Sequence, residues 1–212
     1  MTKSHAAGWT SESPTAAQLA EFFRQVGSGR ITGVRLQAFL RGGDTTDSRF
    51  RLRLFTTLNL AVSRDYVHRT RLADFREVHG SEFFCFNSDL TDEHFPNPSV
   101  QLTPGQELNL EIFQITTVVT SEDCLAFLKS RNALLLGAQG ASIVYELAKD
   151  RLVKNRSCVS FDEKNRLWRD VDGRPRVPRV SVYSDGAFDF SLGRFEMDWR
   201  DGCCLLCFRN PE

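Results

Sequence analysis

The chain has 212 residues, of which 41% are hydrophobic and 25% charged, a composition typical of a globular protein. Lysine plus arginine and aspartate plus glutamate both number 27, so the net charge is zero. This balance argues against a general nucleic-acid or anionic-membrane binder, which needs a basic excess. No run approaches the ~20 apolar residues that span a bilayer, and the first residues contain no apolar signal segment. We therefore expect a cytoplasmic protein without membrane insertion, with surface display by another route as an open alternative.

The first hundred residues predict a small helical pair followed by strands. Apolar spacing indicates helices over 15–26 and 34–40, and alternation indicates one or two strands over 50–63. A weaker helical spacing covers 66–78. Three phenylalanines, at positions 83, 84 and 86, are expected to be buried together. Prolines and glycine between 96 and 105 predict a boundary near residue 100, which makes 1–100 an N-terminal accessory region.

Residues 101–212 are expected to form a strand, two helices and then several short strands, in this order. A strand is expected around Leu108–Ile112 and another from Cys158. Thr120 precedes serine and two acids, the pattern of a helix start. A second helix is expected after Gly137. This order predicts an α+β fold with helices segregated from an antiparallel sheet.

Local motifs for catalysis or metal binding are weak. The sequence contains no P-loop, dinucleotide fingerprint, HExxH or GxSxG motif. A cysteine–histidine pair could form only across the fold, for example Cys158 with His79. Asp170 and Asp172 resemble the start of a calcium loop, but the pattern fails after Gly173, which favours a turn.

The six cysteines are interpreted as reduced thiols, with pairing left open. Cys203, Cys204 and Cys207 lie in an apolar run that favours buried strand residues over a zinc site. His94 follows two acids, but without a second nearby histidine a surface turn is favoured. We expect no metal and no cofactor.

The stretch 168–208 alternates large apolar residues with a chemically mixed set. Val180, Val182, Phe188, Phe190 and Leu192 occupy one face of two expected strands. Between positions 166 and 202 there are seven arginines, seven acids and no lysine. Arginine, tyrosine and serine favour a recognition surface, and a simple solvated sheet face is the alternative.

A family resemblance rests on the order of several segments. These are NSDLTDEHFP (87–96), a strand, two helices, LW(x)DxDGxxRVP (167–178) and GxFxFxLGxFxxxW…CLLCF (186–208). This order resembles the bacterial variable proteins diversified by retroelements. The resemblance covers about residues 85–212. It implies a C-type lectin-like ligand-binding domain over 101–212.

In that family a mutagenic reverse transcriptase rewrites adenines near the 3′ end of the gene, mostly in asparagine codons. The resemblance implies that the ligand-binding, variable positions here are Arg174, Arg179, Ser181, Tyr183, Ala187, Asp189, Ser191, Arg194, Asp198, Arg200, Asp201 and Cys203. All twelve residues are of types reachable from such codons, whereas glutamate and methionine, found at Glu196 and Met197, are not. The apolar framework would be the five alternating residues above with Phe195, Trp199, Leu205 and Leu206, all burying one face.

These observations predict a binding protein rather than an enzyme, and its ligand is expected to be a macromolecule, namely a protein. At the level of the gene, the partner would be the mutagenic reverse transcriptase. One alternative is an oxidase similar to formylglycine-generating enzymes, for which only Cys203 and Cys207 could share a strand face. Another is an intracellular interaction module that recruits a partner through the N-terminal helical pair. Calcium-dependent sugar binding is not supported, because no complete carboxylate and amide cluster occurs in residues 101–212.

Overall fold

The computed structural model of the chain describes residues 23–24, 46–47 and 52–211. The chain divides into two compact units, 1–45 and 46–212. In the first unit only Phe23 and Arg24 are described, and both are helical. The rest of the helices expected over 15–26 and 34–40 lies outside the described residues. Within the described ranges, no helix combines the length and apolar character that crossing a membrane requires.

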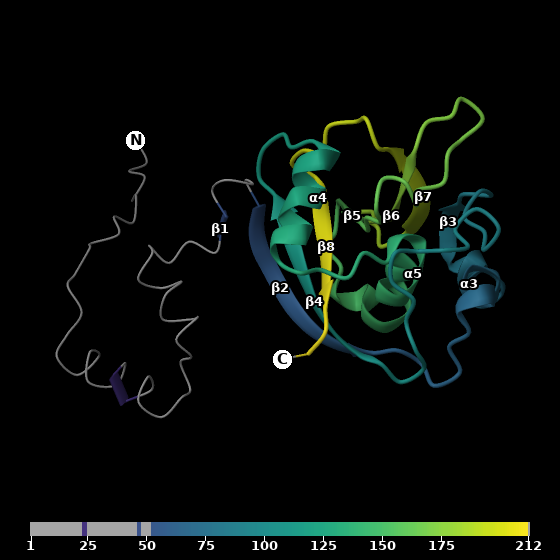
Figure 1. The fold of residues 1–212 in the computed structure, drawn as a ribbon, viewed down its shortest axis with the longest axis horizontal. Helices are drawn as coiled ribbons and strands as arrows, with labels where there is room; N and C mark the ends of the chain where they lie inside the picture. Colours follow the sequence, from purple (N-terminus) through teal and green to yellow (C-terminus); the bar gives the residue numbers. More distant parts are fainter. Residues whose placement is uncertain (1–22, 25–45, 48–51, 212) are drawn as a thin grey trace, which may run out of the picture. The chain divides into compact units, whose positions relative to one another are not determined.

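The second unit is built on one mixed sheet (Figure 1). Its strands lie in the order β1-β2-β4-β8-β5-β6-β7-β3. Neighbours are antiparallel except β5 with β8 and β3 with β7, which are parallel. The α+β prediction is therefore confirmed, but the sheet is mixed rather than antiparallel. The strand bounds are β1 Thr46–Asp47, β2 Leu52–Ala61, β3 Phe83–Phe86, β4 Glu107–Ile115, β5 Arg156–Val159, β6 Arg176–Val182, β7 Phe188–Arg194 and β8 Cys203–Arg209.

Three α-helices are described in the second unit: α3 Arg71–His79, α4 Ser121–Ser130 and α5 Gly137–Ala148. The expected start of α4 is confirmed by a capping box, in which the Thr120 hydroxyl accepts from the Asp123 backbone N–H and the Asp123 carboxylate accepts in return. Three 3₁₀ turns, His68–Thr70, Gly80–Glu82 and Lys149–Arg151, flank α3 and follow α5.

The N-terminus of α3 is capped from a distance. Its own cap residue, Thr70, makes no side-chain capping bond. Instead, the Asp92 carboxylate accepts the backbone N–H groups of Leu72 and Ala73 at 3.0 and 2.9 Å. A negative group that accepts first-turn donors stabilises a helix through hydrogen bonds and the helix dipole. The segment 87–96 therefore holds α3 in place.

The sheet separates two hydrophobic cores. The first contains residues of α3 and α5 together with Val180, Val182 and Phe190. The second contains residues of α4 together with Phe113 and Trp199. Along β8 the side chains alternate: Cys204, Leu206 and Phe208 belong to the first core, whereas Leu205 and Cys207 belong to the second. Because a strand changes face at every residue, β8 is buried on both sides.

Two expectations differ from the structure. Phe83 is buried and Phe86 is partly buried, but Phe84 is 83% exposed. The three phenylalanines belong to a strand, β3, and Phe84 points away from the first core. The expected boundary near residue 100 also falls inside the sheet, because β2 pairs with β4 over nine residue pairs and β3 pairs with β7. The compact unit instead begins at Thr46.

Candidate functional site

The face of β5, β6 and β7 that points away from the first core carries polar side chains in register. Strand pairing places Cys203, Ser157, Ser181 and Asp189 side by side across β8, β5, β6 and β7. We call these four residues the polar row. The Ser157 and Ser181 hydroxyls are hydrogen-bonded at 2.7 Å. Directly opposite residues in a sheet lie about 5 Å apart, so the row is a continuous strip about four strands wide.

A second polar pair lies beside this row. Arg179 of β6 faces Ser191 of β7, and its Nε donates to the Ser191 hydroxyl at 3.1 Å. That hydroxyl donates in turn to the Asp189 carboxylate at 2.9 Å. The other carboxylate oxygen of Asp189 is buried and has no hydrogen-bond partner.

The chain between β7 and β8 runs back along this face of the sheet. Because β7 and β8 point in the same direction, residues 195–202 must return from the end of one strand to the start of the other. This crossing segment begins where the Phe195 N–H donates to the Pro175 carbonyl and ends where the Ser157 N–H donates to the Gly202 carbonyl. Trp199 lies in the middle of the crossing segment, anchors it to the sheet and is fully buried.

Trp199 is held by three kinds of contact. It exchanges two backbone hydrogen bonds of 2.8 Å with Val119. Its indole N–H donates to the Ser121 hydroxyl at 2.8 Å, and that hydroxyl donates to the Phe195 carbonyl. Its ring lies on Gly193, where an added Cβ would be only 2.6 Å from the ring atom Cη2. Glycine is therefore required for this close approach.

Six of the twelve expected variable positions are exposed: Arg174, Tyr183, Arg194, Asp198, Arg200 and Asp201. Four are partly exposed: Arg179, Ala187, Ser191 and Cys203. The remaining two, Ser181 and Asp189, are 7% and 8% exposed, and the expectation that they lie on an open surface is wrong. Both occupy the interior of the sheet with a paired strand on either side.

The exposed positions do not form one cluster, because they lie at both ends of the β6–β7 hairpin and on the crossing segment. Arg174 and Arg194 lie at the end of the hairpin where Arg176 pairs with Arg194. Tyr183 and Ala187 lie in the turn at the opposite end, where the Tyr183 N–H donates to the Ala187 carbonyl. Seven strand residues at ~3.3 Å each separate these ends by about 20 Å.

The expected apolar framework is buried, but on two faces rather than one. Val180, Val182 and Phe190 are buried in the first core, and Phe188 and Leu192 pack against it. Leu206 also belongs to the first core, whereas Phe195, Trp199 and Leu205 belong to the second. The crossing segment brings Phe195 and Trp199 to the opposite side of the sheet, and alternation along β8 places Leu205 there as well. Glu196 and Met197 lie on the crossing segment and are exposed.

All six cysteines are free thiols. Cys203 and Cys207 share a face of β8, but Cys207 is fully buried while Cys203 is partly exposed. Burial raises the pKa of the Cys207 thiol to about 11. Sequence patterns missed the pair formed by Cys158 and Cys204, which face each other in register on β5 and β8 and are both buried.

No group of three or more histidine, cysteine or acidic side chains within the described ranges is placed to hold a metal ion. Asp170 instead organises the expected turn: its carboxylate accepts the N–H groups of Asp172 and Arg174 and the guanidinium of Arg176. Cys158 and His79 have separate partners, since the His79 ring nitrogen Nδ1 bonds to Glu82. His94 stacks on the Trp168 ring at a centroid distance of 4.5 Å.

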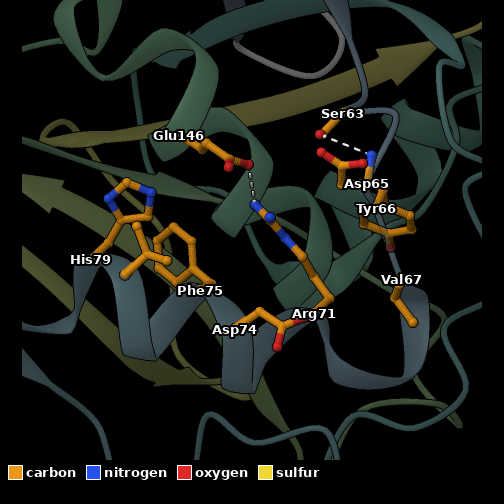
Figure 2. A pocket seen from close by; sticks show the side chains of 10 residues that line it. Ser63, Asp65, Tyr66, Val67, Arg71, Asp74, Phe75, His79 and Glu146 are labelled. Carbon is orange, nitrogen blue, oxygen red and sulfur yellow. Dashed lines mark hydrogen bonds and ion pairs between the residues drawn. The ribbon is translucent and has the colours of Figure 1, made fainter.

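A separate cavity of about 150 Å³ lies beside α3 and was not predicted from sequence (Figure 2). Its floor is formed by Arg71 of α3, which is buried between the rings of Tyr66 and Phe75. Burial raises the pKa of Tyr66 to about 12, partly offset by the Arg71 charge. The Tyr66 hydroxyl is hydrogen-bonded to the His68 Nδ1 atom at 2.9 Å. We call this cavity the α3 pocket.

The fold and site define a mixed α+β protein with a fixed apolar lattice and a polar, partly exposed sheet face. Comparison with protein-family models gave no match, and neither did comparison with curated proteins or with solved structures.

Proposed function

We propose that this chain is a non-enzymatic binding protein that presents a diversified surface on a C-type lectin-like framework. The diversified surface consists of the ten exposed or partly exposed positions described above. The described order of β4, α4, α5 and then β5 to β8 is the order of elements that the family resemblance led us to expect.

The observation that carries the proposal is the separation of core-facing apolar side chains from solvent-accessible candidate positions along β6, β7 and the crossing segment. Val180, Val182 and Phe190 fill the first core, while ten of twelve candidate positions keep solvent-accessible surface. Substitution of exposed side chains usually changes stability by no more than about 0.5 kcal/mol. A surface of this kind can therefore vary while the core keeps the fold.

The size and chemistry of this surface favour a macromolecular ligand. Its two ends lie about 20 Å apart, which matches the scale of a protein footprint better than that of a buried small-molecule site. Arginines and aspartates occur together on it. Such mixed charge favours specific contacts over general attraction to one charge sign.

The framework part of the proposal is tested by substitution at matched positions. Asp198→Tyr and Arg200→Ser replace exposed residues of the crossing segment, and both are expected to leave the urea midpoint of unfolding unchanged. Ser181→Arg places a large cation at a buried site and is expected to destabilise the fold by about 1–3 kcal/mol. Unfolding by Arg200→Ser, or tolerance of Ser181→Arg, would contradict the assignment of the variable surface.

The binding part is tested by a library that varies the six exposed positions together. Selection against a panel of unrelated proteins is expected to yield specific binders with unchanged melting temperature. Failure to obtain any binder from a well-folded library would reject the proposed role. Stoichiometric bound copper together with oxidation of a cysteine-containing peptide would instead favour the oxidase alternative.

The retroelement part is tested in the DNA downstream of the gene. A near-copy of the 3′ end that differs only at adenines, beside a reverse transcriptase gene, is expected. Its absence would remove diversification from the proposal but would leave a binding role to be judged by the library.

A further inference from the structure

The α3 pocket contains a buried guanidinium with few hydrogen-bond acceptors. Arg71 is 7% exposed. Its Nε donates to the Ser142 hydroxyl at 2.9 Å. Its Nη2 lies 2.8 Å from a Glu146 carboxylate oxygen as an ion pair, yet Nη2 donates no hydrogen bond and is itself buried. A guanidinium carries five N–H donors, so this group has the capacity to bind a further acceptor.

Three carboxylates line the pocket together with Arg71, and of these only Glu146 lies against the guanidinium (Figure 2). Asp65 and Asp74 both line the pocket and are exposed. Asp74 accepts a hydrogen bond from the Thr70 hydroxyl at 2.7 Å. Neither aspartate forms an ion pair with any described residue. The pocket therefore offers donors at its floor and negative charge at its mouth.

Part of the remaining wall is apolar, with Ser63 and His79 as polar members of the lining. The Arg71 guanidinium lies 5.3 Å from the centroid of the Phe75 ring, and Val78 lines the same pocket with 67% of its surface exposed. A volume of about 150 Å³ equals that of engineered apolar cavities that take up benzene. The pocket thus suits a molecule of that size with a short hydrocarbon group.

We propose that the α3 pocket binds a small zwitterion, namely an α-amino acid with a short apolar side chain. Its carboxylate would accept N–H groups of Arg71, and a planar guanidinium suits this role. Its ammonium group would face Asp65 and Asp74, and its side chain would contact Phe75 and Val78. None of the twelve variable positions lines this pocket, so the inference does not depend on the proposed function.

Three matched ligands test the charge requirement. Valine carries both charges, 3-methylbutanoate lacks the ammonium group and 2-methylpropylamine lacks the carboxylate. In an NMR titration of the full chain, valine is expected to shift the signals of α3 residues, and these shifts should reach saturation with a Kd of about 1 mM or tighter. Each analogue is expected to bind at least about tenfold more weakly. Equal binding of either analogue, or a failure of valine to saturate, would overturn the proposal.

Variants separate the two halves of the site. The double variant Asp65→Asn with Asp74→Asn changes two exposed residues. It is expected to weaken the binding of valine to the level of 3-methylbutanoate, while the binding of 3-methylbutanoate stays unchanged. Glu146→Gln releases Arg71 from its ion pair and is expected to tighten the binding of 3-methylbutanoate. Glu77→Gln, on the same helix but outside the pocket, is the matched control. Loss of both ligands in the double aspartate variant, or an equal effect of Glu77→Gln, would contradict the assignment.

Discussion

Replacement of Gly193 by alanine is expected to push the crossing segment away from the sheet. The added Cβ would lie 2.6 Å from Cη2 and 3.4 Å from Cζ3 of Trp199, and 3.4 Å from the Met197 sulfur. Carbon atoms in contact are normally about 3.5–4.0 Å apart, so the ring must move by about 1 Å. Trp199 is fully buried and held by Ser121 and Val119, so it has no free direction in which to move.

The magnitude follows from two opposing effects. Forcing an extra methyl group into a packed core costs about 1–3 kcal/mol. Alanine in a strand gains about 0.5–1 kcal/mol over glycine, because the unfolded chain has less conformational freedom. We therefore expect Gly193→Ala to lower the free energy of unfolding by about 1–2 kcal/mol. Urea unfolding followed by tryptophan fluorescence would measure this change.

Two further variants test the cause. Gly80→Ala places a Cβ 3.3 Å from the flexible Arg76 side chain and is expected to change stability little. Trp199→Phe removes the clashing Cη2 atom, so Gly193→Ala should cost less in a Trp199→Phe background than in the parent. A Gly193→Ala protein as stable as the parent would refute the reasoning, as would additivity of the two substitutions.

Three other predictions concern the rest of the described unit. Asp92→Ala should lower the free energy of unfolding by about 1–2 kcal/mol because α3 loses its cap. Glu93→Ala, on the same turn, should change it by no more than about 0.5 kcal/mol, and equal effects of the two substitutions would contradict the capping role. Hydrogen bonds from Lys149, His79 and Tyr145 lower the pKa of Glu82 from 4.5 to about 2. The contribution of Glu82 to the free energy of unfolding is therefore full above pH 4.5 and is lost as pH falls toward 2. Urea midpoints measured across that range should therefore decline less in Glu82→Gln than in the parent, and parallel curves would refute this. Cys85 is the exposed thiol and should react first with a thiol reagent, while the four buried cysteines should react only on unfolding. Early modification of Cys124, Cys158, Cys204 or Cys207 would contradict their burial.

Local patterns were sufficient for most elements of the second unit. The alternation of Val180 and Val182 indicated a strand with one face in a core, and this is what β6 shows. The hydroxyl and acids at 120–123 located the start of α4, because a capping box is formed entirely within four residues. Such features depend on neighbours in sequence, so the sequence contains all the information needed.

Features that depend on distant residues were not predictable. Nothing local to Ser181 or Asp189 indicates that each lies between two paired strands, so their burial was missed. The same holds for the α3 pocket, where Arg71 and Glu146 are 75 positions apart in the chain. The run Cys203–Phe208 looked like one buried strand, but only the parallel pairing with β5 brings Cys204 to Cys158.

The position of β8 has a consequence for how the chain acquires its structure. This strand comes after all the others in sequence, yet it lies between β4 and β5 near the middle of the sheet. Until it is synthesised, the paired strands β2 and β4 and the group β5–β6–β7–β3 have no strand to join them, and each leaves an unpaired edge. Unpaired edges favour association with other chains, and non-local pairing slows folding. A change that prevented β8 from forming would therefore leave two unjoined and aggregation-prone halves of the sheet. A frameshift or stop codon before residue 203 should give insoluble protein rather than a shortened folded domain.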